Sequence, residues 1–168
     1  KGDTKFKEMS REWMERSGNH RYTYNFTWMG RPIIQLPADI MALQEIIWRS
    51  KPDLIVETGI AHGGSIVFSA SMLELIGGDG IVLGIDIDIR PHNRAEIDAH
   101  PMRKRITLLE GSSTSHEILS EVNRIAKDRR RVLVILDSNH THEHVAGELG
   151  LYSPLVRKDG YLVVLDTV

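Results

Sequence analysis

The chain has 168 residues, of which 41% are hydrophobic and 26% are charged, and its formal net charge is −2. This length fits one domain with a sizeable core, and the near-neutral charge offers no basic face for nucleic acid. The absence of cysteine excludes disulfides, a thiolate nucleophile and cysteine-ligated metals, and it makes a reducing cytoplasm the default location. No apolar run reaches the roughly 20 residues of a membrane span. We therefore expect a small-molecule partner.

The first 36 residues differ from the rest, and we expect residues 1–36 to form an N-terminal arm. Residues 1–21 are densely charged, with Trp13 and Met14 embedded, and residues 22–28 are rich in aromatic side chains. This composition fits an amphipathic helix followed by an extended arm over the domain or a neighbouring subunit. It equally fits a poorly ordered segment, and the pattern does not separate the two.

Predicted strands and helices alternate in the remainder of the chain. Apolar residues at helical spacing predict a helix that begins at Pro37 and ends before Pro52. Strands rich in Val, Ile and Leu are expected near residues 53–57, 81–86, 105–110, 131–137 and 161–166. Helices are expected near residues 64–76, 91–99, 115–127 and 141–153. The alternation predicts an α/β fold with a doubly wound, mostly parallel sheet, formed by residues 37–168 as one domain.

An acidic residue stands at the carboxyl end of every predicted strand. These residues are Glu57, Asp86, Glu110, Asp137 and Asp166. Right-handed crossovers place all five ends along one rim of the sheet, where carboxylates repel each other. Exposed strand ends are often polar, but an acid at all five favours a rim that binds a polar ligand and a cation.

A glycine-rich turn follows the first of these strands. It reads Glu57-Thr58-Gly59-Ile60-Ala61-His62-Gly63-Gly64, and its glycines let the backbone approach a ligand at a helix N-terminus. Asp86 ends the next strand, where a carboxylate can accept two ribose hydroxyls. The turn lacks the G-x-G-x-x-G spacing of a dinucleotide site, and Glu57 would repel a pyrophosphate. A cationic ligand with an amino-acid group and a ribose, such as S-adenosylmethionine, suits it better.

Four segments carry a more specific resemblance. They are residues 56–65, Gly84-Ile85-Asp86, Glu110-Gly111-Ser112-Ser113 and Leu136-Asp137-Ser138-Asn139-His140-Thr141-His142. They resemble the cephalosporin hydroxylase family, which has a class I methyltransferase fold, and more distantly catechol O-methyltransferase. The resemblance covers about residues 50–168 and implies an S-adenosylmethionine-dependent O-methyltransferase assisted by magnesium.

The resemblance also implies roles for individual residues. Those expected to bind S-adenosylmethionine are Glu57, Thr58, Gly59, His62, Gly63, Ser65, Asp86, Gly111 and Ser112. Asp137 and Asp166 would bind magnesium, with Thr167 adding a hydroxyl. Leu165 replaces an acidic residue that the family usually has, so a metal-independent enzyme stays open. His140 would act as general base beside Asp137, because a neutral imidazole can accept a proton from an attacking hydroxyl.

Residues 137–144 leave other chemistries open. A non-haem iron site of a hydroxylase needs two histidines and a carboxylate, which would be His140 and His142 with Asp137 or Glu143. We favour the methyltransferase, because the two rings would have to converge on one ion from a turn that enters a helix. His144 is expected to lie on the helix surface. A non-catalytic binding module on the same fold is a third hypothesis.

The methyl acceptor is the least determined feature. Asn139, His140 and His142 make the rim polar, and only 6% of the chain is aromatic. A hydroxyl of a sugar or similar polar metabolite therefore fits better than a catechol, which would need stacking partners. Trp28 is a candidate stacking residue that the arm would bring to the acceptor.

Two surfaces favour a homo-oligomer. The aromatic stretch of residues 22–28 and the apolar last strand would both be exposed in a monomer. The sequence stops at Val168 just as that strand finishes, so we expect it to be part of a longer chain.

Overall fold

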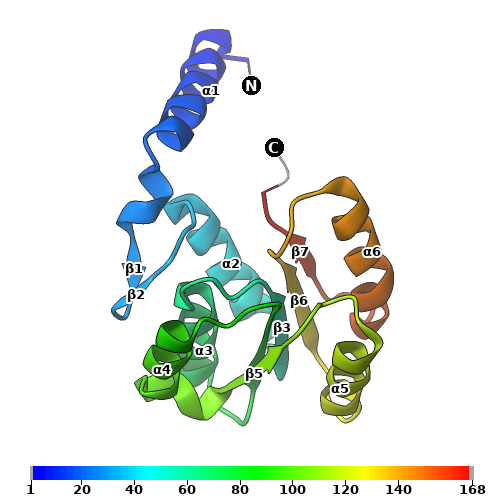
Figure 1. Ribbon diagram of the computed structural model, residues 1–168. Helices are drawn as coiled ribbons and strands as arrows, with labels where there is room; N and C mark the ends of the chain where they lie inside the picture. The colour runs from blue at the N-terminus through cyan, green and yellow to red at the C-terminus, as the bar shows by residue number, and fades with distance from the viewer. Residues whose placement is uncertain (1, 167–168) are drawn as a thin grey trace.

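The computed structural model describes residues 2–166 and contains a five-stranded sheet between two layers of helices (Figure 1). The strand order is β5-β4-β3-β6-β7, and every neighbouring pair is parallel. The strands are β3 (Leu54–Thr58), β4 (Ile81–Asp86), β5 (Ile106–Glu110), β6 (Val132–Leu136) and β7 (Leu162–Val164). The predicted α/β class with a parallel sheet is confirmed.

Helices cover both faces of the sheet. One face carries α2 (Pro37–Ser50), α3 (Gly64–Ile76) and α4 (Pro91–Asp98), and the other carries α5 (His116–Ala126) and α6 (His142–Tyr152). Two short 3₁₀ helices, η2 (Pro101–Arg105) and η3 (Ser153–Leu155), precede β5 and follow α6. Within residues 2–166 no helix has the length and apolar character that crossing a membrane requires.

The core divides into two clusters, because successive strand residues point to opposite faces of the sheet. On β3, Ile55 packs with residues of α2 and α3, such as Ile47 and Phe68. Its neighbours Leu54 and Val56 pack on the other face with residues of α5 and α6. Each fully buried Leu or Ile contributes roughly 1.5–3 kcal/mol, so both layers are held by burial of apolar surface.

The chain direction changes beside β3, and this creates a crevice. From β3 the chain proceeds outward to β4 and β5, then returns to β6 on the other side of β3. In open α/β sheets, ligands bind outside the carboxyl ends of the strands at such a switch point. The β3–β6 edge is therefore where the fold itself provides a binding crevice.

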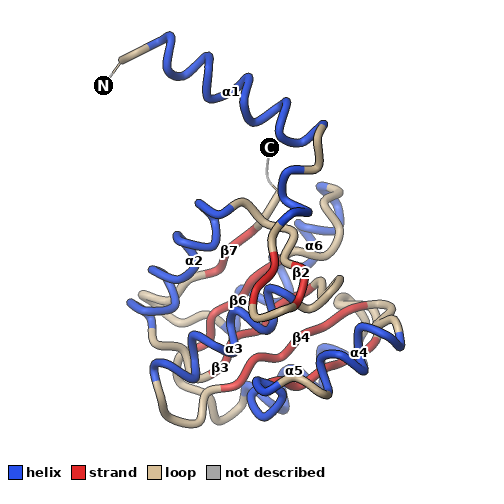
Figure 2. The backbone as a smooth tube through the Cα atoms, turned by 90° about the vertical axis from the view of Figure 1, so that its left-hand side faces the viewer, coloured by secondary structure: helices blue, strands red, loops and turns tan. Residues whose placement is uncertain are grey.

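The N-terminal region begins with α1 (Thr4–Asn19), which Asp3 caps by accepting a hydrogen bond from the Phe6 N–H at 3.0 Å. This helix has no buried residue and projects away from the sheet domain (Figure 2). The 3₁₀ helix η1 (Tyr22–Asn25) and a two-stranded antiparallel hairpin, β1 (Thr27–Trp28) with β2 (Arg31–Pro32), follow it. Of the two alternatives for the start of the arm, the structure has the helix, over Thr4–Asn19.

The hairpin packs against α3. The indole N–H of Trp28 donates to Ser71 Oγ at 2.9 Å, and its ring meets the Phe68 ring edge-on with centroids 4.9 Å apart. Ile33, just after the hairpin, is 3% exposed and belongs to the core. The idea that Trp28 reaches the acceptor is therefore wrong, because this side chain is fixed on α3.

Candidate active site

Gly59 is the residue that lets the ends of β3 and β6 approach each other. Its φ is +89°, in the left-handed region, and a Cβ at this position would lie 2.0 Å from the Asp137 carbonyl oxygen. Gly63, with φ +83°, precedes the first turn of α3. Both glycines are required by backbone geometry, since a side chain would be strained at either position.

Asp86 fixes the turn from the β4 side. Its Oδ2 accepts hydrogen bonds from the backbone N–H of Ile60 at 2.7 Å and of Ala61 at 3.3 Å, and its Oδ1 accepts from Asp88 N–H at 3.2 Å. The carboxylate is half-buried and faces a hollow. The predicted ribose-binding residue thus also holds the shape of the turn.

Arg31 and Asn93 fix the same turn from the other side. The Arg31 guanidinium donates twice to the His62 carbonyl, at 3.0 and 2.7 Å, and once to Asn93 Oδ1 at 3.0 Å. The Asn93 side chain in turn donates to the Ala61 carbonyl at 2.9 Å. Both residues are buried, and our sequence reasoning missed both, because neither lies in a motif and the contacts span more than 30 positions.

Glu57 lies beneath the turn with no exposed surface. The Ser65 hydroxyl donates to its Oε1, whereas its Oε2 has no hydrogen-bond partner among residues 2–166. Burial raises the pKa of Glu57 to about 8, the Ser65 hydrogen bond opposes this rise, and the charge of Asp137 adds to it. Thr58 is also buried, and its carbonyl accepts from the Asp137 N–H at 2.9 Å. Thr58 therefore joins β3 to β6 beneath the surface.

Three adjoining hollows lie along the carboxyl edge of the sheet. The first, of about 230 Å³, is bordered by four predicted residues, Gly59, Asp86, Gly111 and Ser112. The second, of about 50 Å³, lies over the glycine turn and is bordered by Gln35, Gly59, His62, Ser65 and Asp137. The third, of about 460 Å³, extends from Asp137 and Asp166 to Met14 and Tyr24 of the arm. Gly59 is shared by the first two hollows, and Asp137 by the last two.

A cluster of possible metal ligands stands at the third hollow. One ligand atom from each of Asp137, His140 and Asp166 lies within 4.8 Å of the others, and His140 Nε2 is 3.4 Å from Asp166 Oδ2. Burial and the charge of Asp166 raise the pKa of Asp137 to about 6, while His140 and a hydrogen bond from Gln35 oppose the rise. Asp166 has φ +51°, in the left-handed region, which Asp tolerates better than most residues.

This donor set fits a divalent cation. Two carboxylates that repel each other are relieved by a positive ion, and magnesium needs few protein ligands because it keeps several waters. Leu165 does not contribute, since it packs against the core and its N–H donates to the Leu136 carbonyl at 3.0 Å. Thr167 lies outside the described residues.

The two-histidine set of an iron site is not formed within residues 2–166. The cluster holds His140 with two carboxylates, and His142 begins α6 with an exposed side chain. The geometry therefore disfavours the hydroxylase hypothesis as it was framed on His140 and His142.

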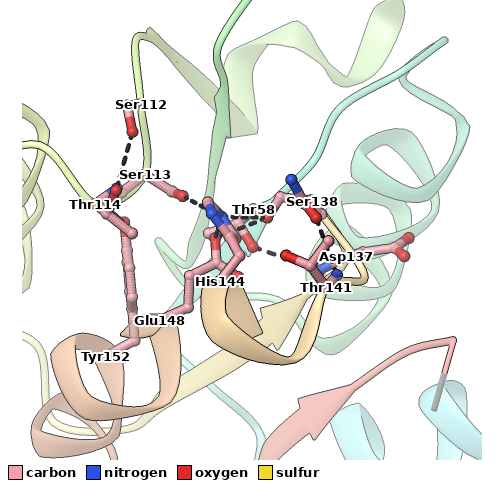
Figure 3. A network of polar contacts seen from close by, with 11 residues as sticks. Thr58, Ser112, Ser113, Thr114, Asp137, Ser138, Thr141, His144, Glu148 and Tyr152 are labelled. Atoms are coloured by element: carbon pink, nitrogen blue, oxygen red, sulfur yellow. Dashed lines mark hydrogen bonds and ion pairs between the residues drawn. The ribbon is translucent and has the colours of Figure 1, made fainter. Parts of the chain in front are cut away.

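His144 was expected on the helix surface, and this prediction is wrong. Its side chain is 25% exposed and borders the first hollow. Its Nε2 contacts Ser113 Oγ, Ser138 Oγ and Glu148 Oε1, as Figure 3 shows. A signal was present in the sequence, because His144 and Glu148 are four residues apart and so share one face of a helix.

The sequence profile described as "Rhamnosyl O-methyltransferase/CmcI" matches residues 20–168 of this chain. The chain belongs to this family. Among its relatives is a rhamnosyl O-methyltransferase of Mycobacterium leprae (strain TN), 32% identical over 155 residues, a match that covers 88% of this chain and 66% of the relative. A second, from Mycobacterium tuberculosis (strain ATCC 25618 / H37Rv), is 32% identical over 145 residues, covering 84% of this chain and 56% of the relative.

Solved structures of CmcI and of other methyltransferases share the fold. CmcI with SAH has a TM-score of 0.61 at 20% identity, over 85% of this chain and 67% of that chain. MycE from the mycinamycin biosynthetic pathway, with Mg, SAH and mycinamycin VI, has a TM-score of 0.55 at 22% identity, over 89% of this chain and 37% of that chain. The chain spans 56–66% of the length of its rhamnosyl O-methyltransferase relatives.

Proposed function

We propose that this chain is the S-adenosylmethionine-dependent part of an O-methyltransferase that acts on a hydroxyl of a sugar or a similar polar metabolite. One observation carries the proposal. Asp137 borders both the hollow over the glycine turn and the larger cleft, which Asp166 also borders, and both carboxylates form a cluster with His140. A methyl donor in the first two hollows would therefore meet an acceptor in the third at a carboxylate-rich junction.

The first two hollows suit the two parts of S-adenosylmethionine. Asp86, Gly111 and Ser112 border the larger one, where ribose and adenine would lie. His62 and Ser65 border the smaller one, where the methionine part would lie above Glu57 and beside Gly63. When bound, S-adenosylmethionine supplies an electrophilic methyl group. CmcI with Mg and SAM, and MycE with Mg and SAH, are solved relatives of the same fold, which supports this assignment.

Asp137 and Asp166 would hold a divalent cation, for which we propose magnesium. When bound, such an ion lowers the pKa of an acceptor hydroxyl and fixes its direction. The chain itself then has two tasks, to hold the acceptor oxygen in line with the methyl group and to remove its proton. Alignment of this kind can supply roughly 7–11 kcal/mol.

His140 is the proposed general base. Asp166 Oδ2 lies 3.4 Å from His140 Nε2, an arrangement that favours a proton on Nε2. The other ring nitrogen, Nδ1, is then the atom that accepts the proton of the acceptor hydroxyl. The charge of Asp166 also stabilises the imidazolium that this transfer produces.

The acceptor cleft supports a polar substrate. Asp39, Asp137 and Asp166 make its lining acidic, and the arm contributes Met14 and Tyr24. The curated relatives at 32% identity are named rhamnosyl O-methyltransferases, which agrees with a sugar hydroxyl.

The test is transfer of a labelled methyl group from S-adenosylmethionine to a panel of deoxysugar glycosides, catechols and β-lactam intermediates. We expect labelling of a sugar hydroxyl, loss of labelling in Asp137→Asn, and a decrease of about 10²–10⁴-fold in His140→Ala. Catechol labelling alone would overturn the acceptor assignment. Unchanged cation affinity in His140→Ala would support a base, whereas a large loss of affinity would make His140 a ligand.

The same experiment also tests the hydroxylase and the binding-module hypotheses. Turnover that requires oxygen and iron would contradict the methyltransferase proposal and support the hydroxylase hypothesis. Binding of S-adenosylmethionine without transfer to any acceptor would indicate a binding module.

We also propose the wider organisation of the protein. Residues 37–168 would be the cofactor-binding domain, and residues 1–36 would be an arm whose last part packs on α3. The exposed apolar side chains of α1, among them Phe6 and Trp13, support a homo-oligomer. A cysteine-free sequence suits the reducing cytoplasm.

A further inference from the structure

The face of α6 that points into the protein carries a row of polar side chains. His144, Glu148 and Tyr152 follow each other at four-residue spacing, and Figure 3 shows them together beside the loops that follow β5 and β6. The Tyr152 hydroxyl donates to the Ser113 carbonyl at 2.7 Å, and the Ser138 hydroxyl donates to Glu148 Oε1 at 2.8 Å. The row therefore ties both loops to α6.

Glu148 places a carboxylate on the buried face of α6, where charged side chains are rare. It has no exposed surface, and its Oε2 has no hydrogen-bond partner among residues 2–166. A buried carboxylate is costly unless its hydrogen bonds compensate for lost hydration. Its Oε1 accepts a hydrogen bond from the Ser138 hydroxyl at 2.8 Å and lies at an ion-pair distance of 3.3 Å from His144 Nε2. The contacts of Nε2 with Glu148, Ser138 and Ser113 together orient the His144 ring.

The contact with Glu148 also favours one tautomer of His144. A carboxylate only accepts hydrogen bonds, so its position beside Nε2 favours a proton on that nitrogen. Nε2 also lies 3.2 Å from Ser138 Oγ and 3.3 Å from Ser113 Oγ. In the neutral ring Nδ1 is then an acceptor only, and it has no partner in the part of the chain that the structure describes.

His144 borders the first hollow together with Gly111, Ser112 and Ser113, and its Nε2 contacts Ser113 Oγ. Under the proposed function the adenine ring lies beside Gly111 and Ser112 and Asp86 holds the ribose, so His144 borders the hollow that receives the adenine ring. Ser112 and Asn139 also border this hollow, but hydroxyl and amide groups can turn to donate or to accept. In the Nε2–H tautomer, by contrast, Nδ1 of His144 can only accept a hydrogen bond.

We propose that His144, oriented by Glu148, accepts a hydrogen bond from the exocyclic amino group of adenine through Nδ1 and so selects adenine over a 6-oxo purine. The inference rests on the proposed function and names a specificity-determining residue of that site. A 6-oxo group would place an acceptor against an acceptor, and a buried polar group without a partner discriminates strongly.

Titration calorimetry with S-adenosylhomocysteine and S-inosylhomocysteine tests the selection. The wild-type chain is expected to bind the adenine compound at least about 10-fold more tightly, which is the value of one hydrogen bond. In His144→Ala this ratio falls to near unity, with weaker binding of S-adenosylhomocysteine. His116→Ala, an exposed histidine on α5, is the matched control and keeps the wild-type ratio.

Glu148 variants separate a positioning role from a merely structural one. Glu148→Gln retains an oxygen that can accept from Nε2–H, so the ratio is retained. Glu148→Leu keeps the volume but frees the ring, so the ratio falls although the protein stays folded by circular dichroism. Equal ratios in the folded Leu variant and the wild type would overturn the role of Glu148.

Nitrogen-15 NMR of the His144 imidazole gives a readout without cofactor. At about pH 8.5, above the ordinary histidine range, the wild-type ring is expected as the Nε2–H tautomer, and Glu148→Leu as a mixture. A dominant Nδ1–H tautomer in the wild type would overturn the inference. Tight binding of both nucleosides with no discrimination would overturn it and leave the proposed function standing. No binding of S-adenosylhomocysteine to the wild type would overturn both.

Discussion

Glu57 combines complete burial with a raised pKa, and this has a consequence for stability. In the folded protein this carboxyl binds a proton up to about pH 8, whereas in the unfolded chain it releases the proton near its ordinary value of 4.5. Between these values the folded state binds more protons than the unfolded state. The free energy of unfolding therefore falls as the pH rises through this window.

Glu57→Gln should remove this part of the pH dependence. The wild type should lose stability between about pH 4.5 and pH 8, and the variant should lose less, by up to a few kcal/mol at the upper end. Urea unfolding at pH 5, 6.5 and 8 measures the difference. Asp79→Asn, which changes an exposed acid, is the control. Parallel curves for the wild type and Glu57→Gln would show that Glu57 is ionised throughout.

The positions of some residues around the candidate site could be predicted from the sequence, and those of others could not. Gly59 and Asp86 were predicted because the local order of strand, turn and strand alone places them together. His144 was predicted on the surface, and this was wrong because loops from other parts of the chain cover that side of α6. Its Nε2 contacts Ser113 in one of these loops and Glu148 on the helix itself. Gln35, which contacts the hollow beside Asp137, had no local pattern to mark it.

At the scale of elements, the hairpin β1–β2 and helix α4 hold the glycine turn between them. Arg31 comes from the hairpin and Asn93 from α4, and together they bond to two consecutive carbonyls, those of Ala61 and His62. A Cβ on Gly64 would lie 2.1 Å from the Pro32 carbonyl oxygen, so the hairpin also touches the start of α3. The turn is therefore shaped by segments far from it in sequence.

Arg31→Lys should weaken this support although it keeps the charge. An ammonium cannot reproduce the forked bonds to His62 and Asn93, and each buried group left without a partner costs about 1–3 kcal/mol. Chemical denaturation should show that loss, and calorimetry should show weaker binding of S-adenosylhomocysteine.

Arg49→Ala serves as the control for the arginine substitution. Arg49 pairs with Glu45 one helical turn away, and both side chains are more than half exposed, so its loss should change stability little. Wild-type stability in Arg31→Lys would mean that the hairpin does not support the turn.

The long elements were predictable because their apolar periodicity extends over several turns or a whole buried strand. The helix at 64–76 has the predicted bounds, and the strand expected at 105–110 is Ile106–Glu110. The hairpin was missed because strands of two residues have no periodicity. For a different reason, the sequence did not decide whether residues 1–21 form a helix. Their many charged residues give no clear indication of a face that would pack against the domain.

At the scale of the whole molecule, α1 stands apart from the domain (Figure 2). Phe6, Met9, Trp13 and Met14 form a stripe along it, and each is at least 40% exposed. We propose that this exposed apolar stripe is a contact surface for a second copy of the chain.

Changing Phe6, Met9 and Trp13 to serine should shift the protein toward the monomer. Light scattering coupled to size exclusion at micromolar concentration measures the mass. The control replaces Lys5, Lys7 and Arg11 of the same helix by serine, which removes charge but leaves the stripe. A wild-type chain that is monomeric under these conditions would contradict the homo-oligomer.

The row of three hollows has a kinetic consequence under the proposed function. Its two ends are bordered by different elements, the loops after β4 and β5 at one end and the arm with β7 at the other. The nucleoside and the acceptor would enter and leave through separate openings, and they would meet only at the junction near Asp137. Neither reactant would then block the path of the other, so the enzyme should follow a random order of binding rather than a compulsory one.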